Sequence, residues 1–195
     1  EIVLFSPVFC PTIGGRFTHT SKPHPQHKVY PYLLRGMKID NPNLVWSTDF
    51  TYIPMPYGYM YLAAVVDWHS RFVLSWTLSN TMDYIFCLDA LTDALEHGEP
   101  VIFNTDQGSQ YTSEHFTQPL LERQILISMD GRGRALDNVF IERVWRSVKY
   151  ENIYSNDYQS VSELRDGLAN YFDEYNHRRP HQALDYATPA EVHYG

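Results

Sequence analysis

The chain has 195 residues, of which 44% are hydrophobic and 19% charged, so its composition excludes wholesale disorder. No apolar run approaches the roughly 18 residues that indicate a membrane-spanning helix. Two cysteines, Cys10 and Cys87, are too few for a disulfide framework, so we expect a reducing compartment, the cytoplasm. The chain begins at Glu1 with neither an initiator methionine nor a basic and apolar leader, which indicates a fragment without a signal peptide.

The net charge of −8 argues against a nucleic-acid partner, because such proteins usually present a basic face. The charge is, however, unevenly distributed. Residues 83–99 hold five acidic side chains and no lysine or arginine, whereas residues 131–149 hold five basic side chains and two acidic ones. A basic strip on one side of an acidic molecule is therefore compatible with this sequence.

Two regions differ in composition. Residues 1–42 contain many prolines and a Gly14-Gly15 pair, which leave no room for a long periodic element and predict an extended or truncated N-terminal arm. From residue 43 to 195 the hydrophobic pattern is regular, which predicts a folded core with a C-terminal helix and tail.

Three strands are expected at the start of this core. Residues 45–53 alternate and are rich in aromatic and β-branched side chains. Residues 59–66 are almost continuously apolar, as in a central strand, and residues 71–78 form the third strand. Because short links join them, the three strands should form an antiparallel meander.

The remaining elements alternate between helix and strand. Apolar side chains at helical spacing predict a helix over 85–95 that Gly98 ends, and Pro119 should kink the following helix or delay its start. The later elements are a strand at 101–105, a helix at 113–124, a strand at 125–129 and helices at 138–152 and 161–177. The order βββαβαβαα predicts an α/β fold with a mixed five-stranded sheet flanked by helices, and it resembles the ribonuclease-H-like fold.

Three acidic residues stand out by their positions. Asp49 lies in the middle of the first strand, where aspartate is disfavoured, although an edge strand could turn it to water. Asp106 ends the fourth strand, where α/β folds place their sites, but it could equally be a turn residue ahead of Gly108. Glu142 lies on the 138–152 helix, capped by Asp137-Asn138, and could simply pair with Arg146.

The helix that carries Glu142 has two distinct stripes. At about 100° per residue, Glu142 shares a stripe with the basic side chains of Arg146 and Lys149. The opposite stripe is apolar and should dock on the sheet, and it consists of Phe140, Val144 and Val148.

The sheet topology allows Asp49, Asp106 and Glu142 to meet at one end. Three oxygen donors suit a hard divalent cation, Mg²⁺ or Mn²⁺, and a cation would offset the repulsion between them. Two such ions about 4 Å apart can activate an attacking oxygen and neutralise a leaving one in phosphoryl transfer. We therefore expect a metal-dependent phosphoryl-transfer site with these three ligands, holding two ions.

The spacing of these acids and the sequence around them resemble a known family. Thirty-five residues separate Asp106 from Glu142. Over residues 21–192 the chain is similar to the DDE transposases of bacterial two-reading-frame insertion sequences, relatives of retroviral integrases. The blocks that carry the resemblance are HPQHKVYPYLLR at 24–35, VWSTDFTY at 45–52, VDWHSR at 66–71, NTDQGSQYT at 104–112, DNVFIERVWRSVKYE at 137–151 and YNHRRPHQAL at 175–184.

The resemblance implies an enzyme that cleaves DNA at the 3′ ends of an element and transfers those ends to a target. It implies Asp49, Asp106 and Glu142 as metal ligands, and DNA and further copies of the chain as partners, in the bacterial cytoplasm at the nucleoid. Contacts to DNA are expected from a basic set: Arg132, Arg134, Arg143, Arg146 and Lys149. Two alternatives stay open: a purely hydrolytic nuclease on the same fold, and an inactive DNA-binding or assembly relic.

Several other conspicuous residues favour structural roles. Aromatic side chains mostly serve packing, so Trp68, Trp76 and Trp145 are expected in the core. Asp67 could be a further ligand, but we expect it to cap a turn. His181 could lie near the site, but we expect it to satisfy a loop carbonyl.

Overall fold

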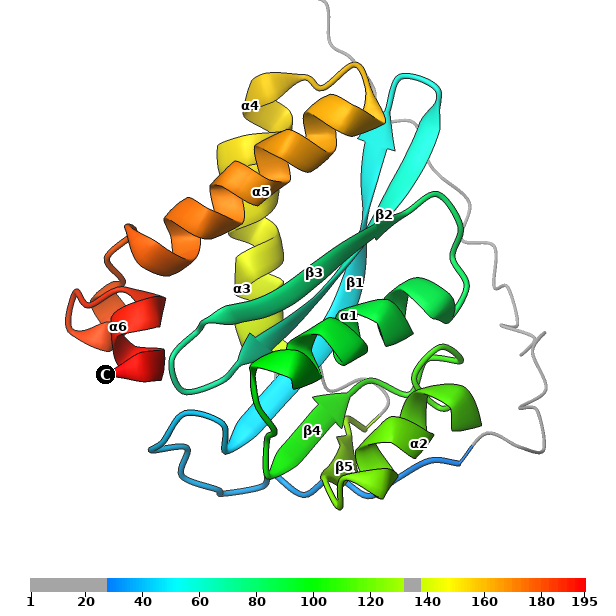
Figure 1. Cartoon of the computed structure of the whole chain (residues 1–195), viewed down its shortest axis with the longest axis vertical. Helices are drawn as coiled ribbons and strands as arrows, with labels where there is room; N and C mark the ends of the chain where they lie inside the picture. Colours follow the sequence, from blue (N-terminus) through cyan, green and yellow to red (C-terminus); the bar gives the residue numbers. More distant parts are fainter. Residues whose placement is uncertain (1–27, 132–137) are drawn as a thin grey trace, which may run out of the picture.

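The computed structural model describes residues 28–131 and 138–195 and contains one five-stranded sheet of order β3-β2-β1-β4-β5 (Figure 1). The strands are β1 (Val45–Met55), β2 (Gly58–Asp67), β3 (Val73–Ser79), β4 (Ile102–Thr105) and β5 (Leu126–Met129). The pairs β1–β2 and β2–β3 are antiparallel, and β1–β4 and β4–β5 are parallel. The expected α/β fold, with its mixed sheet and the order βββαβαβαα, is confirmed.

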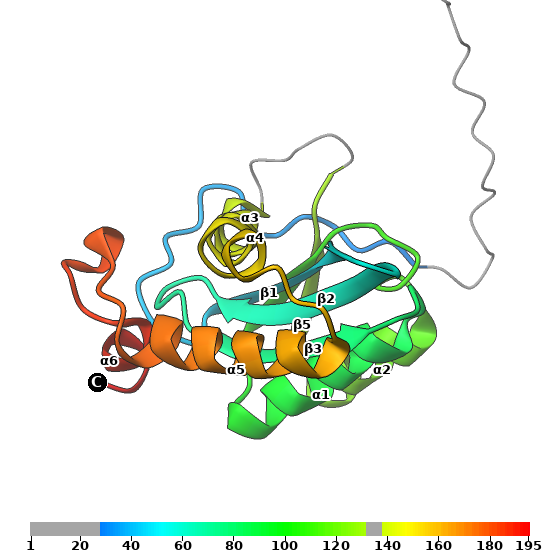
Figure 2. The ribbon, with the colours of Figure 1, turned by 90° about the horizontal axis from the view of Figure 1, so that it is seen from above.

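Helices cover both faces of the sheet (Figure 2). One face packs against α1 (Ile85–His97) and α2 (Glu114–Glu122), and the other packs against α3 (Val139–Ser147). The helix α5 (Val161–His177) closes the α3 side next to β3. Strand β1 contributes to the hydrophobic cores on both faces of the sheet. Trp46 packs in the core beneath α1, and Ile53 packs in the core beneath α3.

The helix that follows β5 is longer and less regular than expected. The prediction was a single helix over 138–152, but α3 continues as a π-helical segment, η2 (Val148–Ile153), and a last turn, α4 (Tyr154–Asn156). Its buried stripe also differs: Ile141 is completely buried, whereas Phe140 is only partly buried against Trp68. The buried face therefore consists mainly of Ile141, Val144 and Val148.

The helix α2 begins before its proline, so the delayed start is wrong. The Ser113 side chain caps it by accepting a hydrogen bond from the Phe116 N–H, and Pro119 lies inside the helix. A good N-cap, together with burial of Phe116 and Leu120, outweighs the bond that a proline removes.

The chain ends in two short elements that the sequence did not predict, η3 (Gln182–Leu184) and α6 (Pro189–Tyr194). Helix α6 begins with a complete capping box formed by Thr188 and Glu191. It packs against α5 and places the buried His193 ring parallel to Phe72, with 4.9 Å between the ring centroids.

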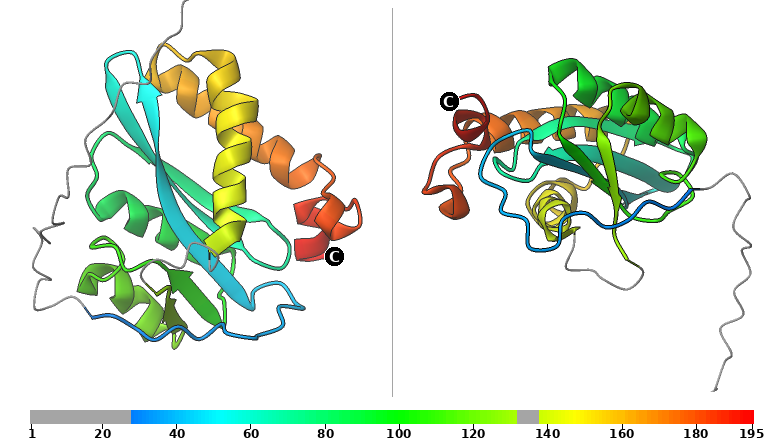
Figure 3. Two further views of the ribbon diagram at one scale, coloured as in Figure 1. Left: turned by 180° about the vertical axis from the view of Figure 1, so that it is seen from behind. Right: turned by 90° about the horizontal axis from the view of Figure 1, so that it is seen from below.

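Residues 28–42 form no helix or strand and run past β5 and β4 to the start of β1 (Figure 3). The Leu33 N–H donates to the Ser128 hydroxyl, and Leu34 is buried against Val45 and Ile102. These residues are therefore attached to the core, while the rest of the expected 1–42 arm lies outside the described residues. No helix in the described ranges is long and apolar enough to cross a membrane.

Candidate active site

Asp49 lies on β1 and faces α3. Its Oδ2 accepts a hydrogen bond of 3.1 Å from the Trp145 indole N–H. Burial raises the pKa of Asp49 from 3.8 to about 6 against the opposing effect of its hydrogen bonds, and the negative charges of Asp106 and Glu142 add to the rise. The structure therefore places the Asp106 and Glu142 carboxylates within electrostatic range of Asp49.

Asp106 follows the last residue of β4, next to Asp49. Strands β1 and β4 run parallel with Ser47 opposite Asn104, so Asp49 and Asp106 each stand two residues beyond this pair. The Asp106 Oδ1 accepts a 2.8 Å hydrogen bond from the Gly108 N–H. Burial by the surrounding atoms raises the pKa of this carboxyl, although Asp106 as a whole is exposed.

The glycine at position 108 leaves room for the Asp106 carboxylate in this turn. A Cβ there would stand 2.8 Å from the Asp106 Oδ1, closer than side-chain carbon atoms approach oxygen. The turn role considered for Asp106 is therefore real, and the same turn fixes the direction of its carboxylate at the end of β4.

Glu142 lies in the first turn of α3 and is exposed. No ion pair joins it to Arg146 in the described part of the chain, so the structure does not form the i,i+4 pair that was considered as an alternative role. Asn138 precedes α3 but makes no side-chain capping bond, which corrects that expectation for Asn138, and Asp137 lies outside the described residues. Glu142 thus keeps its carboxylate available to a cation or to solvent.

The donor set fits a hard divalent cation by its chemistry. All three side chains offer carboxylate oxygens. Burial is the main cause of the raised pKa of Asp49, and a cation would relieve the smaller part that comes from the charges of Asp106 and Glu142. Within residues 28–131 and 138–195, however, no group of three or more His, Cys, Asp or Glu side chains is arranged to hold a metal ion. The three acids are neighbours, but their oxygens do not converge on one point.

Basic side chains follow Glu142 along α3 and η2. The Lys149 ammonium lies 5.0 Å from the Tyr52 ring centroid, and burial lowers its pKa while the charge of Asp49 opposes this. Arg143 and Arg146 are exposed on α3. The other two residues of the expected DNA-binding set, Arg132 and Arg134, lie outside the described residues.

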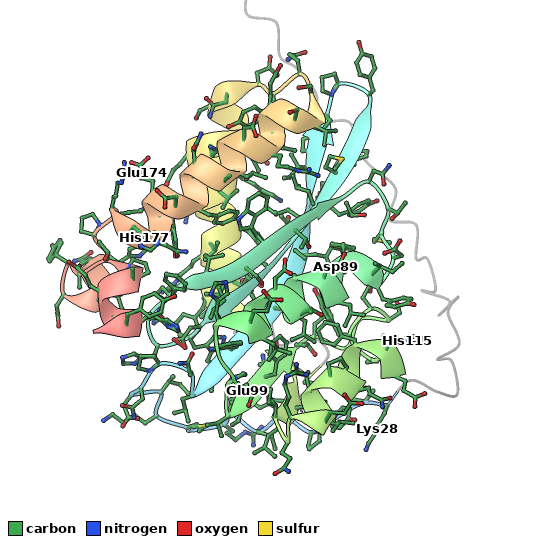
Figure 4. All side chains as sticks on the ribbon, in the orientation of Figure 1. Lys28, Asp89, Glu99, His115, Glu174 and His177 are labelled. Atoms are coloured by element: carbon green, nitrogen blue, oxygen red, sulfur yellow. The ribbon has the colours of Figure 1, made fainter. Side chains whose placement is uncertain are left out.

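The two regions of opposite charge lie on opposite sides of the sheet. Figure 4 shows Asp89 on α1 and Glu99 just beyond it, so the acidic stretch 83–99 belongs to the α1 side. The basic side chains of Arg143, Arg146 and Lys149 come from the helix on the other side. The average charge of −8 therefore does not describe the surface around Asp49.

The tryptophans pack as expected, with one addition. Trp68 and Trp145 are buried, and Trp76 packs against the α3 core with partial exposure. The addition is the Trp145 hydrogen bond to Asp49. The spacing in the sequence could have indicated this bond, because Trp145 follows Glu142 by three residues and therefore lies beside it on the helix surface.

Asp67 caps a turn, as expected. It is completely buried, its Oδ2 accepts from the Ser70 N–H and hydroxyl, and its Oδ1 accepts from the Asn43 N–H. The Ser70 hydroxyl also lies 3.1 Å from the His193 Nδ1, which ties α6 to this turn. All of these bonds hold loops together, and they give Asp67 no position beside Asp49.

Asp67→Asn is expected to lower the free energy of unfolding by about 1–3 kcal/mol, because the new amide N–H₂ would face either the Ser70 or the Asn43 donor. Metal binding should be unchanged. Urea unfolding and a Mn²⁺ titration of both proteins test this. A loss of metal affinity without a loss of stability would make Asp67 a ligand.

His181 satisfies a backbone group, but one in α5 rather than in a loop. Its ring hydrogen-bonds to the Tyr175 backbone. Burial, followed by the positive charges of Arg179 and Arg71, lowers the pKa of His181. His181 therefore lies close to Arg71 and Arg179, in an arginine-rich region beside α3.

The fold is that of retroviral integrase catalytic cores. A chain of the simian T-cell lymphotropic virus intasome, solved in complex with PP2A regulatory subunit B56 gamma, superposes with a TM-score of 0.72 at 21% identity, covering 88% of this chain and 61% of that one. The HTLV-2 integrase catalytic core domain, solved with magnesium, superposes with a TM-score of 0.65 at 18% identity, covering 80% of this chain and 98% of that one. At these identities the likeness establishes the fold alone.

The sequence relatives specify the family. Two family descriptions, both of an integrase core domain, match residues 40–135 and 123–189. The transposase for insertion sequence element IS904 of Lactococcus lactis is 35% identical over 158 residues, covering 79% of this chain and 62% of the relative. The transposase for IS629 of Shigella sonnei is 32% identical over 160 residues, covering 81% and 54%.

The chain therefore belongs to the integrase core family of insertion-sequence transposases, as the sequence motifs indicated. It spans about half to three fifths of the length of these curated relatives.

Proposed function

We propose that this chain is the catalytic core of a transposase that cleaves DNA at the 3′ ends of an element and joins those ends to target DNA. The observation that carries the proposal is the placement of Asp49 and Asp106 at equivalent positions of the parallel strands β1 and β4, with Glu142 close enough for its charge to act on Asp49. Family membership supports DNA transposition as the general process.

The reaction consists of two phosphoryl transfers. In the first, water attacks a phosphodiester, a new P–O bond forms, and the bond to the 3′ oxygen breaks to release a 3′-hydroxyl. In the second, that hydroxyl attacks a target phosphodiester and displaces a different 3′ oxygen. No covalent intermediate with the protein is needed, so the protein positions charges rather than supplying a nucleophile.

The chain's own residues would hold and orient the reacting groups. Asp49, Asp106 and Glu142 would bind two Mg²⁺ or Mn²⁺ ions, which supply an activated attacking oxygen and neutralise the leaving oxygen. Trp145 and the Gly108 N–H hold two of these carboxylates in place. Arg146 and Lys149, on the same stripe of the helix, would contact phosphates of the DNA end.

The organisation around this core is also part of the proposal. Residues 43–195 form the catalytic unit, preceded by the 1–42 arm, and copies of the chain associate on paired DNA ends. Arg132 and Arg134 contact DNA strands ahead of α3. The protein acts on DNA at the nucleoid of the bacterial cytoplasm.

A strand-transfer assay tests the function. The purified chain receives pre-cleaved element-end DNA, target plasmid and Mn²⁺, and the products are separated on a denaturing gel. Joined products support the transposase, nicks alone support the nuclease, and neither product supports the relic. The Lactococcus lactis relative, with its own element ends, serves as the positive control for the assay.

Lys149→Ala should weaken binding of end DNA roughly 5–10-fold at low salt and reduce the salt-dependence slope by about 1, because one phosphate contact is lost. Fluorescence anisotropy at several salt concentrations measures both quantities. Lys38→Ala is the matched control, since Lys38 is exposed and already paired with Asp40. Equal slopes for the wild type and Lys149→Ala would exclude this phosphate contact.

A further inference from the structure

Four arginines from three parts of the chain line one cavity of about 660 Å³ beside α3. Arg71 follows β2, Arg143 and Arg146 come from α3, and Arg179 follows α5. The sequence contains 11 arginines in all and a net charge of −8, so this concentration of positive charge is unusual for the molecule. Only Arg143 and Arg146 belong to the DNA-binding set expected from the sequence.

The positive charge of the cavity is only partly balanced. Its one acidic lining residue is Glu151, whose carboxylate binds the Arg179 guanidinium through both oxygens and accepts a 2.9 Å hydrogen bond from the Tyr171 hydroxyl. In the described ranges no ion pair forms at Arg71, Arg143 or Arg146. Three of the four guanidinium groups are thus available to an anion.

Arg71 is held in place for such a role. It adopts a left-handed backbone conformation with φ of 64°, its guanidinium hydrogen-bonds to the Trp68 carbonyl, and its Cζ lies 3.6 Å from the Phe140 ring centroid. Burial, with a smaller effect from the charge of Arg143, lowers the pKa of Arg71 to about 10. Its side chain therefore stays charged at neutral pH and is already ordered, so ligand binding costs little rotamer entropy.

A second, independent sign of a ligand is His181. Its Nε2 is buried and has no hydrogen-bond partner among the described residues, although His181 lines the cavity. Buried polar atoms nearly always have partners, so this atom is one that a bound molecule would satisfy. An anion in the cavity would favour the protonated imidazole, whose Nε2 then donates to it.

The cavity and Glu142 lie on neighbouring faces of the same helix. Arg143, Ser147 and Tyr150 face the cavity, Glu142 and Lys149 occupy the next stripe, and Arg146 stands between the two. A helix with its side chains is about 10–12 Å wide. A DNA strand that crosses α3 can therefore contact both faces of the helix.

We propose that this cavity binds a phosphate group of a DNA strand that crosses α3. The planar, forked guanidinium groups of Arg71, Arg143 and Arg146 suit the tetrahedral oxygens of phosphate. The choice of a DNA strand rests on the proposed function. The cavity adds Arg71 and His181 to the DNA-contacting surface. Arg143 contacts DNA inside the cavity, whereas Lys149 does so beside Glu142.

Two substitutions with opposite expected signs test the proposal. Arg143→Gln should weaken the affinity for a 20-base-pair element-end duplex about 5–10-fold and lower the salt slope by about 1, because one phosphate contact is lost. Glu151→Gln should strengthen the affinity several-fold, because it removes the carboxylate that occupies Arg179. A purely structural role for the Glu151–Arg179 pair predicts no such gain.

The matched control is Arg178→Gln. Arg178 precedes Arg179 but does not line the cavity, and its side chain is 75% exposed and 3.9 Å from Asp173. Anisotropy in Ca²⁺, with melting curves to verify folding, should show wild-type affinity for this variant. Equal losses for Arg143→Gln and Arg178→Gln, or no gain for Glu151→Gln in a folded protein, would overturn the proposal.

Calorimetry with inorganic phosphate separates a DNA strand from a free anion. Weak, millimolar binding that Arg143→Gln abolishes, together with the affinity changes above, supports a strand phosphate. Micromolar binding of free phosphate with unchanged duplex affinity overturns it in favour of a small anion. None of these measurements depends on turnover. A protein that shows the expected affinity changes but no strand transfer would refute the proposed function and leave the phosphate-binding cavity in place. A protein that transfers strands but lacks the affinity changes would refute the phosphate-binding cavity alone.

Discussion

Asp49→Asn, Asp106→Asn and Glu142→Gln are each expected to reduce strand transfer on the order of 10³-fold or more while leaving the fold intact. Each change keeps the size of the side chain and removes one anionic oxygen donor, and groups that act as a unit in catalysis lose most of their effect when one is removed. Gel assays with pre-cleaved ends and Mn²⁺ measure the rate, and circular dichroism verifies the fold.

Asp166→Asn is the matched control for these three variants. Asp166 is an exposed residue of α5, away from Asp49, and its substitution should leave the rate unchanged. Near-normal strand transfer by any one of the three variants would remove that residue from the set of ligands. Normal transfer by all three would refute the proposed function.

Much of the fold could be predicted because its signals are local. The alternation in β1, the apolar run of β2 and the helical spacing over α1 each depend on the burial of a particular face. The π-helical segment η2 could not be predicted, because it depends on how Val148 and Ile153 both reach the core formed with α5. Helix α6 was missed because it has only six residues and is held by tertiary contacts of His193.

The candidate site was predictable in its acidic members and not in its neighbours. Asp49 attracted notice because aspartate is unusual inside a strand, and Glu142 because its helix is strongly two-sided. The hydrogen bond between Trp145 and Asp49 joins residues 96 positions apart. Likewise Arg71 and Arg179 are ordinary surface arginines in the sequence, and only the packing of α3 against the end of α5 brings them into one cavity.

Asp49→Asn is also expected to stabilise the protein above pH 6 by up to about 3 kcal/mol, because the pKa of Asp49 is raised from 3.8 to about 6 and each pKa unit corresponds to about 1.4 kcal/mol. The favourable state of this group is the protonated one. The contribution of protonated Asp49 to the free energy of unfolding is complete below pH 3.8 and is lost as the pH rises through 6. Asparagine is neutral throughout and can still accept the Trp145 hydrogen bond, so the variant avoids the cost of a buried charge.

Melting curves of both proteins from pH 4 to pH 8 measure this effect. The two melting temperatures should agree near pH 4 and separate up to pH 6, and the gap should then stay constant at no more than about 6–12 °C for a chain of this size. Mg²⁺ or Mn²⁺ should raise the melting temperature of the wild type and narrow the gap at pH 7.5, because a cation that binds only the folded carboxylates stabilises the fold. A gap of the same size at pH 4 and pH 7.5 would show that charge at Asp49 is not its cause, and a gap that metal leaves unchanged would remove Asp49 from the ligands.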